Sequence, residues 1–191
     1  MFLNEIIQNT VLEYYRILDH FMLPSVKVDI FEQLGKAKRI LIVTPSNNED
    51  FSIAQKYFST LTQLFQNAGI SLVISEEHES FDSLSTEYHI LKLTKNNITA
   101  LGFPNKRFLA SLQNTGYDII IDLSPDYDFF STSLCRASGS ALKICLSSPK
   151  RDPFYNFLIR TDSDLSLSQR YEILLHYLRA CVVTEPSSVV S

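Results

Sequence analysis

Two continuous apolar runs restrict the folds open to this chain. They are residues 39–45 (RILIVTP) and 117–124 (YDIIIDLS), and a helix-like pattern follows each of them. A strand that is apolar on both faces belongs in a parallel sheet that helices cover on both sides. In open α/β sheets the ligand binds at the carboxyl ends of the strands. The sequence therefore predicts an α/β fold and indicates where a site would lie.

Strand-like and helix-like segments alternate along most of the chain. We expect strands at 39–44, 70–75, 87–94, 117–123, 141–146 and 157–161, and helices at 51–68, 104–115, 127–138 and 164–180. This alternation predicts a three-layer, Rossmann-like domain with a mostly parallel, doubly wound sheet. Right-handed crossovers place strand 39–44 near the middle of the sheet, with strand 117–123 parallel to it as a neighbour or near neighbour.

An amphipathic helix is predicted before this domain, at residues 2–22. Its apolar stripe has spacings of three and four and consists of Leu3, Ile7, Val11, Tyr14, Leu18 and Phe21. The stripe either packs on the chain's own sheet or forms a homodimer. A membrane-surface helix is not expected, because the polar face is not basic. We divide the chain into a helical extension (1–36), the α/β domain (37–182) and a flexible tail (183–191).

Composition and charge exclude several classes of function. The formal net charge is −4, which gives no electrostatic reason to expect a nucleic acid or an anionic membrane as partner. No run of about 18 apolar residues is present, so no membrane span is expected. The five glycines form no phosphate-binding loop, and the three cysteines lack metal-ligand spacing. We expect no cofactor, no metal, reduced thiols and a cytoplasmic location.

Polar residues follow both apolar runs and form the candidate ligand site, for which a small molecule is the expected partner. They are Ser46, Asn47 and Asn48 after the first run, and Asp122, Ser124 and Asp126 at the end of the second. Each has a structural alternative: the first three are turn and helix-capping residues, and Asp122 can bind loop amides. Asp126 is most simply the cap of helix 127–138.

Three segments resemble family 9 glycosyltransferases, the lipopolysaccharide heptosyltransferases. Residues 41–51 (LIVTPSNNEDF) are similar to the family's first strand and its Ser-containing loop, which ends in Gly-Asp at a helix start. Residues 117–123 resemble the family's aspartate-flanked strand, and 134–139 resemble the helix after it. The resemblance covers roughly residues 38–147 and corresponds to the amino-terminal, acceptor-side half of a two-domain bacterial enzyme. We expect a closer relative among uncharacterised single-domain families of Bacteroidota.

The resemblance implies a role for Asp50. The matching aspartate of the family is the general base that deprotonates the acceptor hydroxyl, whereas a carboxylate at a helix start is otherwise a cap or first-turn residue. Glu49 stands where the family has glycine, and no segment matches the donor-nucleotide half. We therefore predict a non-catalytic or partner-dependent protein on a glycosyltransferase-like scaffold. The alternatives are a sugar- or nucleotide-acting transferase with Asp50 as base, and a structural or regulatory homo-oligomer.

Overall fold

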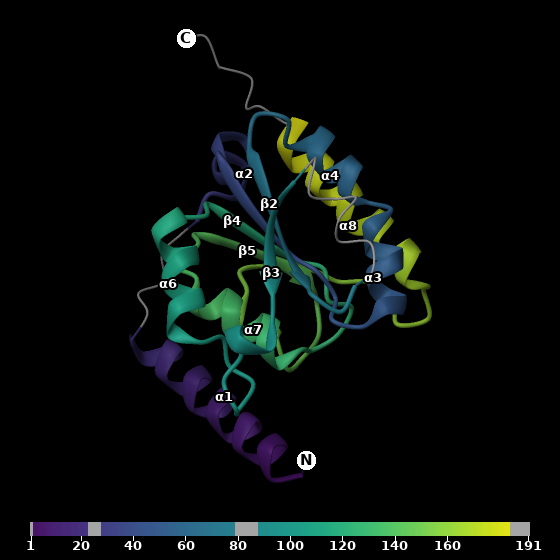
Figure 1. Cartoon of the computed structure of the whole chain (residues 1–191). Coiled ribbons are helices and arrows are strands. Elements are labelled where there is room, and N and C mark those ends of the chain that lie inside the picture. The colour runs from purple at the N-terminus through teal and green to yellow at the C-terminus, as the bar shows by residue number, and fades with distance from the viewer. Residues whose placement is uncertain (1, 23–27, 79–87, 184–191) are drawn as a thin grey trace.

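A computed structural model describes residues 2–22, 28–78 and 88–183 and shows one six-stranded sheet (Figure 1). The strands are β1 (Arg39–Val43), β2 (Gly69–Ser75), β3 (His89–Leu93), β4 (Ile119–Asp122), β5 (Leu142–Leu146) and β6 (Phe157–Ile159). All pairs are parallel, in the order β3-β2-β1-β4-β5-β6. The predictions of a parallel sheet, of a central first strand and of its pairing with the strand at 117–123 are confirmed.

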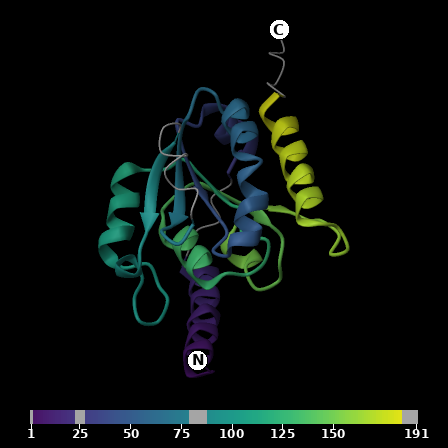
Figure 2. The same cartoon turned by 45° about the vertical axis from the view of Figure 1, so that its right-hand side comes forward.

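Helices cover both faces of this sheet and make three layers (Figures 1 and 2). On one face lie α2 (Ile30–Lys36), α3 (Asn48–Gln55), α4 (Phe58–Leu64) and α8 (Leu167–Val183). On the other lie α6 (Lys106–Thr115) and α7 (Phe129–Ala137), with α1 (Phe2–Met22) beside them. The fold is therefore the predicted Rossmann-like α/β architecture.

Alternation along the central strands explains why their apolar runs are continuous. In β1, Ile40 and Ile42 point to the core under α2, α3, α4 and α8, whereas Leu41 and Val43 point to the core under α6 and α7. All four side chains are at most 2% exposed. A strand with helices on both faces needs apolar residues at every position, which is the pattern seen in the sequence.

Some helix boundaries differ from the expected ones. The helix predicted at 51–68 is two helices, and Gly69 begins β2 instead of ending a helix. The predicted stop at Gly116 is confirmed, because this residue has φ +67° after α6. A capping box begins the last helix: the Ser166 amide donates to Gln169 Oε1 at 2.9 Å, and the Gln169 amide to Ser166 Oγ at 3.4 Å.

The amino-terminal helix is present as predicted, but its apolar stripe does not pack on the sheet. The helix α1 projects from the lower end of the domain (Figure 2) and docks through another side. Gln8 Nε2 donates to the Leu101 carbonyl at 2.8 Å, Leu12 is buried, and Tyr15 lies under the Arg136 guanidinium. Because α6 and α7 already cover this face of the sheet, α1 contacts the outer side of that layer. None of the helices in the described part of the chain combines the length and apolar character needed to cross a bilayer.

Candidate functional site

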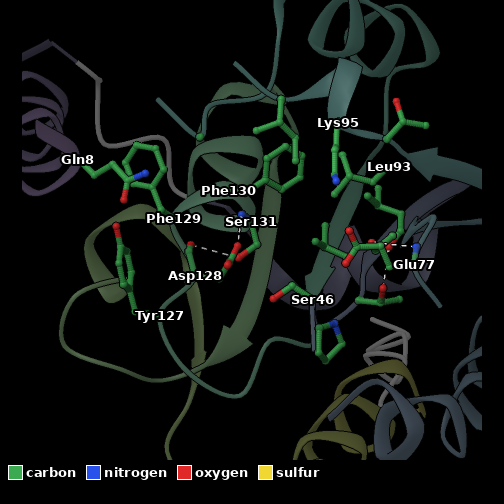
Figure 3. Close-up of a pocket in the computed structure, with 18 of the residues that line it drawn as sticks. Gln8, Ser46, Glu77, Leu93, Lys95, Tyr127, Asp128, Phe129, Phe130 and Ser131 are labelled. Atoms are coloured by element: carbon green, nitrogen blue, oxygen red, sulfur yellow. Dashed lines mark hydrogen bonds between the residues drawn. The ribbon is translucent and has the colours of Figure 1, made fainter. Parts of the chain in front are cut away.

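A cavity of about 670 Å³ lies at the carboxyl ends of β1, β2 and β3. Its walls come from the segments that follow these strands, from the start of α7 and from α1 (Figure 3). The chain reverses its direction of strand addition between β1 and β4, and both Ser46 after β1 and Asp128 after β4 line the cavity. The cavity is therefore at the topological switch point, where open α/β sheets hold their ligands.

The charged groups that line this cavity are mostly acidic. The carboxylates are those of Glu5, Glu76, Glu77 and Asp128, and the cations are Lys95 and Lys150. The formal charge of the described lining is thus negative. Hydroxyl and amide groups complete the polar lining, and they come from Gln8, Asn9, Thr44, Ser46, Ser75, Thr94, Tyr127 and Ser131.

Aromatic side chains form one wall of the cavity. Tyr127, Phe129 and Phe130 line it from the start of α7, opposite Lys95 and Glu77 (Figure 3). The Phe129 ring is fixed by an edge-to-face contact with Phe103, whose ring centroid is 4.6 Å away. Burial raises the pKa of Tyr127, whose hydroxyl oxygen is buried and has no hydrogen-bond partner among the described residues. The wall therefore offers flat apolar faces beside polar groups.

The helices that follow β1 and β4 are capped by the chain's own side chains. In α3, Asn47 Oδ1 accepts the Asp50 amide at 2.8 Å. In α7, Asp128 Oδ1 accepts the Ser131 amide at 2.7 Å. Asp128 is the cap in place of the predicted Asp126, because α7 begins two residues later than expected. Each cap occupies one of the first-turn amides that otherwise attract phosphate groups at helix N-termini.

Asp122 lies beneath the cavity in a fully buried ion pair. Its Oδ2 is 2.9 Å from Arg151 Nη2, and both side chains are 0% exposed. The same carboxylate accepts the Tyr155 hydroxyl at 2.5 Å and, through Oδ1, the Ser124 amide at 2.9 Å. The bond to a loop amide was one of the two predicted roles of Asp122. Burial raises the pKa of the neighbouring Cys145 thiol to about 12, so this thiol is neutral and unreactive at neutral pH.

Arg151 links this buried pair to the cavity. Its Nη1 donates to the carbonyls of Ser124 at 2.6 Å and of Asp126 at 3.0 Å. Those bonds fix the loop between β4 and α7, and the next residues of that loop are Tyr127 and Asp128, which line the cavity. Burying a guanidinium costs free energy unless it is paired, so Asp122 makes this arrangement tolerable. Asp122 and Arg151 thus position the site without touching its interior.

His78 joins the segment after β2 to the segment after β1. Its ring stacks on Phe51 at 4.0 Å, Nε2 donates to the Pro45 carbonyl at 3.2 Å, and Nδ1 lies 2.5 Å from Asn48 Oδ1. Burial lowers the pKa of this imidazole, while the Pro45 carbonyl and Glu77 act in the opposite direction. His78 therefore fixes the relative position of two cavity walls.

The predicted site residues fall into three groups. Ser46 lines the cavity. Asn47, Asn48 and Asp50 organise the start of α3, where Asp50 Oδ2 accepts Asn47 Nδ2 at 2.5 Å. The remaining three, Asp122, Ser124 and Asp126, surround Arg151 with side-chain or backbone oxygens.

Several lining residues were missed by sequence reasoning. They lie after β2 and β3 and include Glu76, Glu77 and Lys95. Their position in the sequence could have identified them. Both segments follow strands that are predicted to be parallel and to end at the same edge of the sheet as the strand before Ser46. The described residues contain no group of three or more His, Cys, Asp or Glu side chains that could hold a metal ion.

Comparison with known proteins places the chain in a family. The model of a family of unknown function, DUF6913, matches residues 23–180. The chain belongs to this family. No curated protein sequence matches it.

Solved structures resemble the same region in fold. The E. coli heptosyltransferase WaaC with ADP is 18% identical with a TM-score of 0.57, and the match covers 80% of this chain and 49% of that enzyme. The same enzyme with ADP-2-deoxy-2-fluoro heptose matches at 17% identity and a TM-score of 0.57, over 80% and 50% of the two chains. A family 9 glycosyltransferase from Veillonella parvula matches at 17% identity and a TM-score of 0.53, over 80% and 44%.

These matches confirm the predicted resemblance at the level of fold. The chain has the architecture of half a family 9 glycosyltransferase and spans about half the length of the enzymes it matches. At this identity the likeness shows the fold alone.

Proposed function

We propose that the chain binds a hydroxyl-rich small molecule without negative charge, of the sugar class, in the cavity at the carboxyl ends of β1, β2 and β3. The observation that carries the proposal is the lining itself. It combines an acidic balance of charges with hydroxyl, amide and aromatic groups in a volume of about 670 Å³. The protein then acts as a non-catalytic or partner-dependent binding module on a glycosyltransferase-like scaffold.

Sugar chemistry matches this lining. A carboxylate such as that of Glu76 or Glu77 accepts hydrogen bonds from sugar hydroxyls, and the hydroxyl of the exposed Ser46 can donate to them. The apolar face of a sugar ring packs on aromatic side chains, here Tyr127 and Phe130. Glycosyltransferase neighbours of the same fold support the sugar class as the first to test.

A nucleotide diphosphate fits this cavity poorly. Two of the solved neighbours hold ADP or an ADP sugar. In this chain the described lining has more carboxylates than lysines, so a diphosphate would meet net repulsion. The caps of α3 and α7, Asn47 and Asp128, already occupy amides that would bind its oxygens. These features support an acceptor-type ligand over a donor-type one.

A transferase with Asp50 as general base is less well supported. A base must come within about 3 Å of the hydroxyl that it deprotonates. The Asp50 carboxylate instead accepts Asn47 Nδ2 at 2.5 Å in the first turn of α3. If transfer occurs, we propose that the donor site lies outside the described residues and that Asp50 must first release Asn47.

We also propose a cytoplasmic location and no nucleic-acid partner. Unpaired Cys135, Cys145 and Cys181 suit a reducing compartment. The net charge of −4 disfavours binding to polyanions.

A thermal-shift screen tests the ligand proposal. Neutral sugars, amino sugars, sugar phosphates and nucleotides are compared at equal concentration. A ligand at about 100 times its dissociation constant stabilises the fold by about 2.7 kcal/mol. We expect stabilisation by a neutral or amino sugar and none by ADP or ATP. The proposal fails if nucleotides stabilise and sugars do not.

A pair of tryptophan variants locates the binding. Ser46→Trp fills the cavity from an exposed loop and should abolish the ligand-induced shift. Ser163→Trp places the same side chain in an exposed turn outside the cavity and should keep the shift. Equal loss in both variants, or in neither, would place the ligand elsewhere.

A further inference from the structure

The helix α1 uses its more polar side to dock on the domain. Glu5, Gln8 and Asn9 line the cavity, Leu12 is buried, and Tyr15 contacts Arg136. These positions lie on one face of the helix. Among the residues that the structure describes, the domain contacts named here all lie on this face, and the opposite face points away from them.

That opposite face is apolar and exposed. Ile6, Tyr14 and Ile17 are 48%, 59% and 57% exposed, whereas large apolar side chains in this fold are mostly buried. Thr10 lies between them on this face of the helix, and Ile7, Val11 and Leu18 extend the face beyond Tyr14; none of these four residues carries a charge. The Thr10 hydroxyl donates to the Ile6 carbonyl at 2.8 Å, so this polar group is satisfied within the helix.

The sequence of α1 repeats in a way that indicates a helical partner. Leu3, Ile7, Thr10, Tyr14, Ile17 and Phe21 follow one another at alternating spacings of four and three residues. This is the spacing of the a and d positions of a heptad, the seam along which helices pair. Leu12 falls at position f of the same heptad, on the side away from the seam, and f is the side that docks on the domain.

We propose that this seam of α1 pairs with the seam of a second copy of the chain. The paired faces are uncharged, so two copies meet without like-charge repulsion. Glu13, beside the seam, is already 3.5 Å from Arg16 of its own helix. The proposal is independent of the ligand, because the seam and the cavity use opposite sides of α1.

Other kinds of partner fit this seam less well. Arg16 is the one Lys or Arg of residues 2–22, against Glu5, Glu13 and Asp19, so the helix has no basic flank for an anionic lipid surface. A seam that repeats along the whole helix pairs with an equal length of helix, and a second copy supplies one. Two-fold association through one self-complementary patch is the commonest form of homo-oligomer.

The size of the seam determines how stable the proposed dimer should be. A helix of this length spans about 31 Å, and its paired face is about 10 Å wide. Such a strip is smaller than the roughly 800 Å² per partner of a standard interface. The dimer should therefore be reversible and dissociate on dilution to about micromolar concentration or below.

Sedimentation velocity on the full chain tests the proposal, from low to high micromolar concentration. We expect the wild type to shift from monomer to dimer across this range. Ile17→Glu places a charge in the seam and should remain monomeric throughout. Tyr177→Glu changes a side chain that is also 50% exposed, on α8, and should dimerise as the wild type does.

Circular dichroism of each variant shows whether it is folded, since both positions are exposed and should tolerate the change. A wild type that stays monomeric at all concentrations overturns the proposal. So does an Ile17→Glu variant that dimerises like the wild type. Loss of dimer in Tyr177→Glu, with the fold intact, would place the interface on α8 and also overturn it.

Discussion

The buried pair of Asp122 and Arg151 should be the most sensitive polar feature of the fold. Arg151→Met removes the guanidinium and its bonds to the carbonyls of Ser124 and Asp126. It leaves the Asp122 carboxylate, which is 0% exposed, with two donors, the Ser124 amide and the Tyr155 hydroxyl. Removing one partner of a buried pair costs about 3–5 kcal/mol, because an uncompensated charge remains.

This cost can be measured by urea unfolding or by thermal melting. For a chain of this size about 1 kcal/mol shifts the melting temperature by roughly 2–4 °C, so Arg151→Met should lower it by roughly 6–20 °C. Asp122→Leu should lower the free energy of unfolding by a similar amount, since it leaves the buried Arg151 guanidinium without its carboxylate partner. The double variant should cost less than the sum of the two, by about 2–3 kcal/mol.

A surface pair serves as the matched control. Lys36 and Glu32 are 2.8 Å apart in α2 and are largely exposed. Glu32→Gln should cost no more than about 1 kcal/mol, because water screens the pair. If Arg151→Met cost as little as Glu32→Gln, or if the two buried variants were additive, the argument from buried charge would be refuted.

Three further variants test the residues around the cavity. Asn47→Ala should destabilise by about 1 kcal/mol in denaturant melts and cost more than Asp50→Ala, because Asn47 is the cap of α3; the reverse order would make Asp50 the residue that secures the helix. Asp128→Asn should raise stability near neutral pH and keep the cap, since burial raises the pKa of Asp128 and its charged form is disfavoured; a loss as large as that of Asp128→Ala would contradict this. Burial lowers the pKa of His78, so its contribution to wild-type stability should fall as the pH drops below the ordinary histidine value. His78→Gln should flatten that dependence between about pH 7 and 5, and an unchanged slope would exclude His78 as its source.

The architecture could be predicted because the residue composition of the core strands shows that both of their faces are buried. Ile40 to Val43 are apolar at every position, and only a sheet that is covered on both faces accommodates such a run. The handedness of crossovers placed β1 near the middle of the sheet with β4 as a neighbour or near neighbour, and the two strands pair directly. Local boundaries were harder: Asp126 and Asp128 are both plausible caps, and the start of α7 depends on how Arg151 holds the loop before it.

The sequence predicted which edge of the sheet holds the cavity, but only some of the residues that line it. Ser46 follows one of the two continuous apolar runs, whereas Glu76, Glu77 and Lys95 follow strands that carry no such run to mark them. The role of Arg151 was not predictable, because its partner Asp122 is 29 positions earlier in the sequence and only the fold brings them together. The stripe of α1 was found from its period, but its orientation depends on which surfaces α6 and α7 leave free.

The central claim is that the cavity at the carboxyl ends of β1, β2 and β3 binds an uncharged or cationic hydroxyl-rich ligand. An NMR titration of isotope-labelled protein with the sugar that gives the largest thermal shift tests it most directly. The account predicts that the backbone amides of residues 44–46, 75–77 and 127–131 change most, and that ADP causes no change there. Changes confined to the exposed face of α8, or a larger response of the same amides to ADP, would contradict it.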